Sequence, residues 1–246
     1  MILQKEFEKS GNWLFRWRSY LPLVMFIILL IALFNYDYLF GSEFVTAIWN
    51  GLCITISFLG LIVRIITIGH TPEGTSGRTT GAPEAETLNT SGIYATVRHP
   101  LYLGNFLNGL GIAMFPHNGW LVVIYILVFW IYYERIMFAE EAFLVRKFGD
   151  AYIAWAETTP AIVPDIKNYK KNVLPFSLKT ILKREYSGFF AIVLTFFVLK
   201  LLSELFAGGD YEIHTAWWVF LLFGFLVWFT LRTLKRKTTW LDVEGR

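Results

Sequence analysis

Apolar and polar segments alternate along the chain, and six apolar runs stand out. They cover residues 21–40, 44–68, 102–115, 120–138, 188–206 and 216–234. A helix needs roughly 20 residues to cross a hydrocarbon core of about 30 Å, and four of the runs are plainly long enough. The run at 102–115 is short and is followed by the helix-breaking sequence PHNG, so we interpret it and the next run as a hairpin of membrane helices. The pattern predicts an all-α integral membrane protein with about six transmembrane helices.

Basic residues are distributed unevenly between the two sides that six crossings would define. One side receives the lysines and arginines near both chain ends and in the two long loops. The other side receives Asp37, Glu43, Asp210 and Glu212 without a lysine or arginine. By the positive-inside rule, both termini and the long loops should face the cytoplasm. The same cationic face should bind anionic lipid headgroups.

Composition narrows the class of protein further. Hydrophobic residues make up 55% of the chain, and the one cysteine, Cys53, lies in an apolar run, so neither a disulfide framework nor a thiolate zinc site is expected. We predict no metal site, and no signal peptide because the first twenty residues show no small-residue cleavage site.

The basic stretch at 167–184 is assigned to headgroups rather than to nucleic acid. Lys200 and Glu204, four residues apart in an apolar run, are expected to pair with each other.

The second long loop, residues 135–187, contains an amphipathic pattern. Its apolar residues at helical spacing are Leu144, Phe148, Tyr152 and Trp155. This spacing predicts a helix that lies on the membrane surface. Gly149 should weaken that helix, and Pro160 with Pro164 should end it.

Two motifs carry a resemblance to a known family. The sequence RHPLYLGN at residues 98–105 precedes the short hairpin, and EEAFLVRKFGDAYIAW at 140–155 follows it, before the closing TPAIVP. Together they resemble the integral-membrane methyltransferases that include isoprenylcysteine carboxyl methyltransferases and phospholipid methyltransferases. The resemblance covers about residues 88–164. Upstream, TSGR and LNTSGIYATVRHPLYLGN look more like the lipid A phosphate methyltransferase branch.

The resemblance divides the chain into three regions. Residues 1–87 form an N-terminal two-helix membrane region with a cytoplasmic loop, and 88–165 form the methyltransferase signature region. Residues 166–246 form a basic cytoplasmic segment and a C-terminal helix pair. The family implies S-adenosylmethionine as cofactor, held between the RHP segment, the hairpin and the EE helix. The implied cofactor-binding residues are Arg98, His99, Pro100, Leu101, Tyr102, Leu103, Gly104, Asn105, Glu140 and Glu141.

The chemistry of this cofactor makes those residue types sensible. Arg98 and His99 can donate to its carboxylate, and arginine can do so with two parallel bonds. Backbone N–H groups of residues 101–104, freed by Pro100, are candidates for further contacts. Glu140 and Glu141 supply acceptors for the ribose hydroxyls, the amine or the sulfonium charge. Arg98 and Glu141 are the candidates for catalysis.

Tyr102 and a set of arginines complete the predicted site. Tyr102 can stack on the adenine or approach the sulfonium. Arginines expected to border the pocket and bind the substrate are Arg64, Arg78, Arg135 and Arg146. An equal alternative for Arg64 is that its side chain snorkels to the membrane surface. An equal alternative for Arg78 is that it is a solvated loop arginine.

An excess of cations favours an anionic acceptor, which needs positioning rather than a strong base. We therefore expect O-methylation of a lipid phosphate, lipid A 1-phosphate, at the cytoplasmic face of a bacterial inner membrane. The alternatives are an isoprenylcysteine-type carboxyl or phospholipid N-methyltransferase, an NADPH-dependent membrane reductase, and a non-catalytic membrane scaffold.

Overall fold

The computed structural model describes the chain except for residues 1, 19, 35, 76–84 and 208–212. Its described residues form the α-helices α1 (Leu3–Trp17), α2 (Leu21–Leu33), α3 (Glu43–Ile68), α4 (Pro100–Met114), α5 (Gly119–Phe148), α6 (Asp150–Thr158), α7 (Leu178–Ala207) and α8 (Thr215–Lys237). Three short 3-10 helices cover Leu39–Gly41, Ile93–Ala95 and Ile166–Asn168. Within the described ranges, β-structure is confined to one isolated bridge between Gly92 and Lys170. The predicted all-α class is confirmed.

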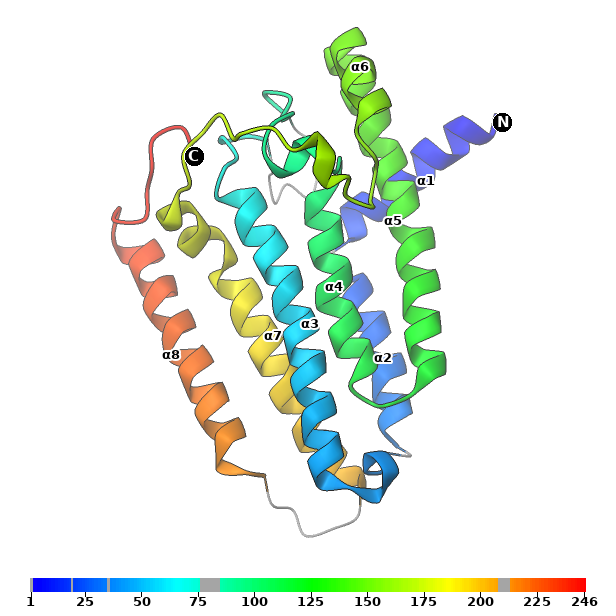
Figure 1. Ribbon diagram of the computed structural model, residues 1–246, viewed down its shortest axis with the longest axis vertical. Coiled ribbons are helices and arrows are strands. Elements are labelled where there is room, and N and C mark those ends of the chain that lie inside the picture. Colours follow the sequence, from blue (N-terminus) through cyan, green and yellow to red (C-terminus); the bar gives the residue numbers. More distant parts are fainter. Residues whose placement is uncertain (1, 19, 35, 76–84, 208–212) are drawn as a thin grey trace.

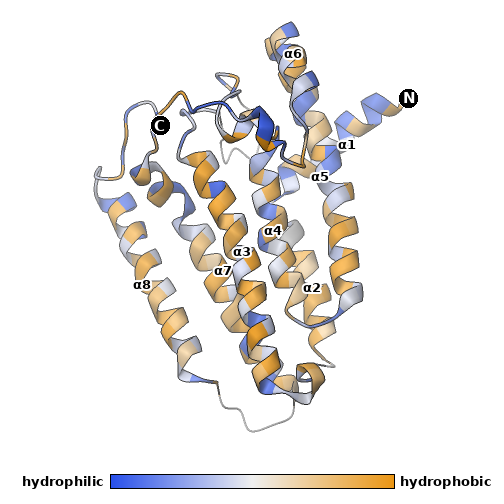
Figure 2. Cartoon of the chain, viewed as in Figure 1, coloured by the Kyte–Doolittle hydropathy of each residue, from blue (hydrophilic) through white to orange (hydrophobic). Residues whose placement is uncertain are grey.

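Helices α2, α3, α4, α5, α7 and α8 form a bundle, and both chain termini lie at the same end of it (Figure 1). Helices α3, α5, α7 and α8 are long and apolar enough to cross a membrane. Helices α2 and α4 run alongside them but have only 13 and 15 residues. Hydrophobic residues dominate the bundle, and hydrophilic residues gather at the end that carries the termini (Figure 2). The structure thus supports a membrane protein with four long spans, whereas the expectation of about six crossings and of cytoplasmic termini stays a prediction.

The α3–α4 interface is built from small residues. A Cβ atom added at Gly104 would lie 2.6 Å from the Arg64 Cγ atom and 2.8 Å from the Gly60 carbonyl oxygen, too close for any real side chain. The Ser57 hydroxyl donates to the Asn108 carbonyl oxygen at 2.7 Å across the same interface. Small residues let two helix backbones approach closely in a membrane. This close contact fixes the start of α4, and with it the site described below.

The predicted surface helix around Gly149 does not exist as one element. Helix α5 continues through the first half of that pattern to Phe148, and α6 takes up the second half. Gly149 between them has a φ angle of 54°, in the left-handed region that glycine tolerates and a right-handed helix excludes. The apolar residues at 144–155 therefore belong to two helices, and the sequence spacing was misleading.

Helix α1 is an amphipathic helix that the sequence interpretation missed. It runs obliquely against the upper part of α5 (Figure 1). The Tyr132 hydroxyl donates to the Leu14 carbonyl oxygen at 2.9 Å, and the Arg135 guanidinium lies 3.4 Å from the centre of the Phe7 ring. Tertiary contacts with α5 thus hold α1 in place.

At the opposite end of the bundle, the expected pairing of Lys200 with Glu204 is confirmed. Their side chains form a buried ion pair within α7. The Tyr38 hydroxyl donates to the second Glu204 oxygen at 3.0 Å. This cluster joins α7 to the segment before α3, far along the bundle from the signature motifs.

Candidate functional site

A cavity of about 730 Å³ opens among the helices where α4 begins. Polar and charged side chains that line it include Arg18, Arg64, Asn89, Tyr94, Arg98, His99, Tyr102, Asn105, Asn108, Glu140, Tyr152, Arg184 and Glu185. Apolar side chains of α2, α4 and α5 line its other part, among them Leu23, Phe26, Leu29, Ile112, Leu121 and Phe129. Glu140 and Leu121 both belong to α5, and their separation of 19 positions corresponds to about 28 Å of helix axis. The cavity is therefore elongated along the bundle, with a polar end and an apolar end.

One group of polar residues, the Arg98 cluster, consists of Arg98, His99, Tyr102, Glu140 and Glu141. The Arg98 Nε atom donates to a Glu141 carboxylate oxygen at 2.9 Å, and the His99 Nε2 atom lies 2.9 Å from the same oxygen. The other ring nitrogen of His99 is 3.7 Å from a Glu140 oxygen. The ring of Tyr102 stacks on the His99 ring with centroids 5.6 Å apart. The two motifs, 42 or 43 residues apart in the chain, thus meet side chain to side chain.

Arg98 also fastens the segment after α6 to the start of α4. One terminal nitrogen of its guanidinium donates to the carbonyl oxygens of Ala156 and Thr159 at 2.7 and 2.9 Å. The backbone N–H groups of Arg98 and His99 donate to the carbonyl oxygens of Pro160 and Ala161. This pairing explains why a TPA sequence follows the EE motif, since its backbone closes the polar end of the cavity.

These bonds change the role predicted for Arg98. A guanidinium has five N–H donors, and four of those of Arg98 already point at Glu141, Ala156 and Thr159. At most one donor remains for a ligand, so the double contact with a cofactor carboxylate is not available in this arrangement. Arg98 is better described as a residue that positions Glu141 and the closing segment.

Other predicted cofactor contacts are redistributed as well. Leu103, Gly104 and Glu141 do not line the cavity, whereas Arg98, His99, Pro100, Leu101, Tyr102, Asn105 and Glu140 do. The backbone N–H groups of Tyr102 and Leu103 both donate to the His99 carbonyl oxygen, at 3.1 and 3.2 Å, because α4 closes its first turn on itself. Gly104 faces α3 instead of the cavity. Of the backbone N–H groups at residues 101–104 that were expected to be free for a ligand, those of Tyr102 and Leu103 are thus already used within the helix.

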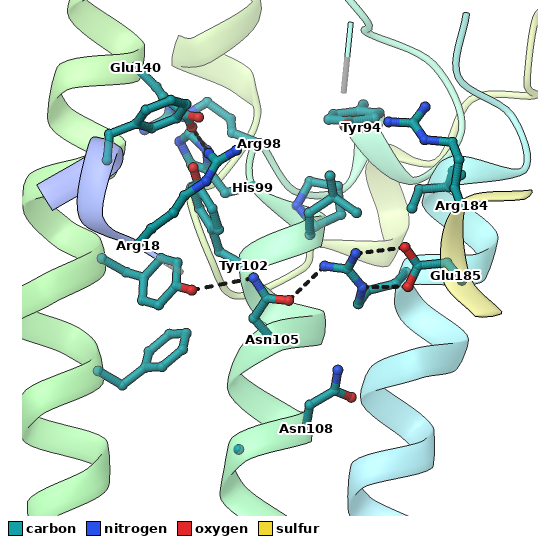
Figure 3. Close-up of a pocket in the computed structure, with 18 of the residues that line it drawn as sticks. Arg18, Tyr94, Arg98, His99, Tyr102, Asn105, Asn108, Glu140, Arg184 and Glu185 are labelled. Atoms are coloured by element: carbon teal, nitrogen blue, oxygen red, sulfur yellow. Dashed lines mark hydrogen bonds and ion pairs between the residues drawn. The ribbon is translucent and has the colours of Figure 1, made fainter. Parts of the chain in front are cut away.

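A second group, the Arg64 cluster, lies across α4 from the first and consists of Arg64, Tyr94, Asn105, Arg184 and Glu185 (Figure 3). Two nitrogens of Arg64 donate to the two Glu185 oxygens at 2.8 and 2.7 Å. A third donates to the Asn105 side-chain oxygen at 2.6 Å. Asn105 in turn donates to the Tyr133 hydroxyl at 3.4 Å. The chain of contacts runs from α7 through α3 and α4 to α5.

Tyr94 belongs to this cluster through electrostatics. Burial raises the pKa of its hydroxyl, the Glu140 carboxylate adds to that rise, and Arg184 and Arg64 oppose it. Tyr94 therefore stays a neutral hydroxyl at physiological pH and can donate a hydrogen bond into the cavity. It also lies within electrostatic reach of both clusters.

Of the four arginines expected to bind the substrate, the cavity contains one. Arg64 lines it as a buried ion pair, which replaces the snorkelling alternative. Arg135 and Arg146 lie outside the cavity lining and contact α1, where Arg146 pairs with Glu8 at 2.6 Å. Arg78 lies outside the described residues.

Several cavity residues were missed by the sequence analysis, namely Arg18, Tyr94, Arg184 and Glu185. The sequence did indicate that an acidic partner such as Glu185 should exist, because an arginine within an apolar run, such as Arg64, needs a carboxylate partner. The partner is 121 residues away, and nothing local identified it among the acidic residues.

The cavity lining holds buried polar atoms that have no partner within the described part of the chain. They include the Asn108 side-chain oxygen and the Trp155 indole nitrogen. Buried polar atoms in native proteins are normally hydrogen-bonded. An acceptor and a donor held ready at a cavity wall suit a ligand with hydroxyl, amine and ring-nitrogen groups.

Comparison with known proteins agrees with this geometry. Residues 51–151 match the sequence profile of the family described as phospholipid methyltransferase. The chain is 40% identical over 77 residues to a protein-S-isoprenylcysteine O-methyltransferase of Schizosaccharomyces pombe, covering 31% of this chain and 33% of the relative. The human protein of the same name is 34% identical over 87 residues, covering 35% and 31%.

A third relative is matched over a longer stretch. The cobalt-zinc-cadmium resistance protein CzcN of Cupriavidus metallidurans is 31% identical over 135 residues, which cover 54% of this chain and 59% of the relative. No solved structure matches the chain significantly. The chain spans about a third of the length of the isoprenylcysteine methyltransferases it matches. Over residues 51–151, therefore, the chain is similar to the family described as phospholipid methyltransferase, and this match covers less than half of the chain.

Proposed function

We propose that this protein is an S-adenosylmethionine-dependent membrane methyltransferase that methylates an anionic oxygen on a lipid-borne acceptor. The observation that carries the proposal is the cavity, whose polar end is formed by the residues of the family motifs and whose apolar end follows α2, α4 and α5. A cofactor with charged and polar groups fits the first part. A lipid chain fits the second.

The Arg98 cluster suits the cofactor by its chemistry. Glu140 lines the cavity as a carboxylate and can face the sulfonium or the amine. Tyr102, held by stacking on His99, offers a ring face to the sulfonium or to the adenine. Arg18, which directly follows α1, lines the same end and suits the cofactor's carboxylate. Arg98 and Glu141 act through the others, by holding His99 and the closing segment.

Held beside Glu140 and Tyr102, the cofactor would supply an electrophilic methyl group on a sulfonium sulfur, with S-adenosylhomocysteine as its leaving group. A carboxylate or phosphate oxygen is already ionised at neutral pH. The protein therefore needs no strong base and contributes alignment and electrostatics.

The apolar part of the cavity supports entry of the acceptor from the bilayer. Leu23 of α2 lines the cavity and is also 60% exposed on the outer surface. A side chain that belongs to both surfaces marks a place where the cavity reaches the outside of the bundle. We propose that the lipid chain enters beside α2 and that the anionic head then lies at the polar end.

The finer assignment concerns the acceptor. The TSGR and LNTSGIY segments favour a phosphate of lipid A, at the cytoplasmic face of a bacterial inner membrane. The S. pombe and human relatives, which are protein-S-isoprenylcysteine O-methyltransferases, favour the carboxylate of an isoprenylated cysteine. The shared chemistry is an oxyanion on a lipid chain, and the assay below separates the two.

The test combines cofactor binding with analysis of the methylated product. Purified protein should be stabilised against thermal unfolding by S-adenosylhomocysteine and not by NADPH. Stabilisation by NADPH alone would favour a reductase, and no response to either would refute the proposal. With methyl-labelled cofactor and a lipid extract, a base-resistant methyl phosphodiester would identify a phosphate acceptor. Methanol released by mild base would identify a carboxyl acceptor, and label on an amine headgroup would contradict an anionic oxygen.

A further inference from the structure

We propose that the Arg64 cluster is the binding site for the oxyanion of the acceptor, with Glu185 as the residue that positions Arg64. This inference rests on the proposed function and adds to it the place and the chemistry of acceptor binding. Glu185 and Arg184 lie on α7, outside the residues that match the family. The site therefore combines a matched helix, α3, with an unmatched one.

The geometry of Arg64 supports this role. Its three bonds to Glu185 and Asn105 use three of five N–H donors, and the other two make no hydrogen bond to any residue in the described ranges. The side chain lines the cavity and is fixed from two sides, by α7 and by α4. A guanidinium that is rigidly held and has donors left over is well suited to a planar oxyanion.

The charges on the two sides of α4 are complementary to the two reactants. The cofactor carries a sulfonium cation, and the Glu140 carboxylate lines its side of the cavity. On the other side, the Arg64 and Arg184 guanidinium groups line the cavity beside the Glu185 carboxylate, which pairs with Arg64. An acceptor oxyanion placed there would lie opposite the methyl donor. Asn105 lies between the two sides and touches both Arg64 and Tyr133 (Figure 3).

Glu185 has a second effect beyond holding the arginine. Without Glu185, the full charge of Arg64 would stabilise the free oxyanion strongly, and only interactions that are stronger in the transition state than in the ground state accelerate a reaction. By taking up part of the Arg64 charge, Glu185 leaves the acceptor oxygen bound but still nucleophilic. Glu185 is thus a positioning residue, because it acts through Arg64 and does not itself attract an anion.

The competing explanation is that the ion pair only ties α3 to α7. A buried pair is weak evidence for stability, since replacing both partners with apolar residues of similar size is often neutral or stabilising. The double variant Arg64→Met/Glu185→Leu therefore keeps the helices together and removes the cation. The double variant Lys200→Leu/Glu204→Leu is the matched control, because it removes another buried pair from α7 at the far end of the bundle.

The experiment measures lipid binding by thermal shift, with three ligands that share one farnesyl chain. They are S-farnesylthioacetic acid, its neutral carboxamide, and farnesyl monophosphate, each added to protein saturated with S-adenosylhomocysteine. Wild-type protein and the Lys200/Glu204 control should bind an oxyanion at least tenfold more tightly than the carboxamide. The Arg64/Glu185 double variant and Arg184→Gln should lose that preference and keep their affinity for S-adenosylhomocysteine within about twofold. Tightest binding by the acid indicates a carboxylate site, and tightest binding by the monophosphate indicates a phosphate site.

Two results would overturn the inference while leaving the proposed function intact. One is a wild-type protein that binds S-adenosylhomocysteine but does not distinguish the acids from the carboxamide. The other is an oxyanion preference that persists in both Arg64/Glu185 and Arg184 variants. If Arg64→Met/Glu185→Leu fails to fold, Arg184→Gln alone decides the question, since Arg184 takes no part in the Arg64–Glu185 ion pair. Wild-type protein that binds no S-adenosylhomocysteine at all contradicts the proposed function itself.

Discussion

Replacing Arg98 with methionine should detach the closing segment from the polar end of the cavity. The variant loses the bonds to the Glu141 carboxylate and to the carbonyl oxygens of Ala156 and Thr159. A hydrogen bond to a charged group contributes about 1.5–3 kcal/mol, and bonds that share one donor group are not additive. Arg98 and Glu141 are 18% and 27% exposed, so water replaces part of what is lost. We therefore expect a total cost of about 1.5–3 kcal/mol.

If the closed segment is needed for cofactor binding, this cost falls on the binding equilibrium. It then weakens the affinity for S-adenosylhomocysteine roughly ten- to 150-fold, measurable by calorimetric titration. Trypsin should also cut faster after Lys167, which follows the detached segment. The control is Arg146→Met, whose ion pair with Glu8 lies on the surface at 58% and 29% exposure and contributes about 0–1 kcal/mol. Unchanged affinity and unchanged cleavage in Arg98→Met would refute the positioning role of Arg98.

Three further predictions concern the bundle around the site. Gly60→Ala should destabilise the protein by about 1–3 kcal/mol in a detergent melting experiment, because its new Cβ would collide with the backbone of α4. The control is Gly119→Ala, whose new Cβ meets open space, and this variant should melt like wild type. Burial lowers the pKa of His117, so near that pH range the unfolded chain binds a proton that the folded chain does not. The free energy of unfolding should therefore fall as the pH drops below about 6.5. A His117→Asn variant should show a smaller fall. Lys200→Leu/Glu204→Leu should leave affinity for S-adenosylhomocysteine near the wild-type value, and a large loss in a folded protein would show that the far-end cluster communicates with the cavity.

The long helices were predictable because their signal is local. The apolar run at 44–68 coincides with α3 almost residue for residue. The run at 21–40 does not coincide with α2, which ends at Leu33. Its last part, although apolar, contains Phe40 with a φ angle of 54° and a 3-10 turn. Hydrophobicity predicts burial in a membrane or a core, but it does not specify where a helix stops.

The amphipathic elements were harder to predict, because helical spacing alone does not say which helix continues. Residues 144–155 have helical spacing but are divided at Gly149, whose effect was underestimated as a mere weakening. Residues 3–17 mix charges with aromatics, and their helix is held by contacts with α5, such as the bond from Tyr132 to Leu14. Contacts of that kind join residues 118 apart and leave no trace in a sequence window.

The sequence revealed the motif residues of the candidate site but only one of the arginines on its substrate side. Arg98, His99 and Glu140 lie in two motifs at a fixed separation, and a motif pair can be recognised in one sequence. The arginines of the substrate side were chosen for their charge alone, and Arg135 with Arg146 turned out to contact α1 instead. Charge predicts a cationic surface, whereas the position of each cation depends on how the helices pack.

The cavity wall combines residues inside the family match with residues outside it. Residues 51–151 supply the Arg98 cluster, and they also supply Arg64 and Asn105. The rest of the cavity wall comes from outside the match, with Arg18 and the apolar residues of α2 on one side and the Arg184–Glu185 pair of α7 on the other. The residues that would contact a lipid chain and its anionic head can therefore change while the cofactor end is kept. The nature of the acceptor has to be learned from α2 and α7 of this protein, and the Arg64–Glu185 pair is where such an experiment should begin.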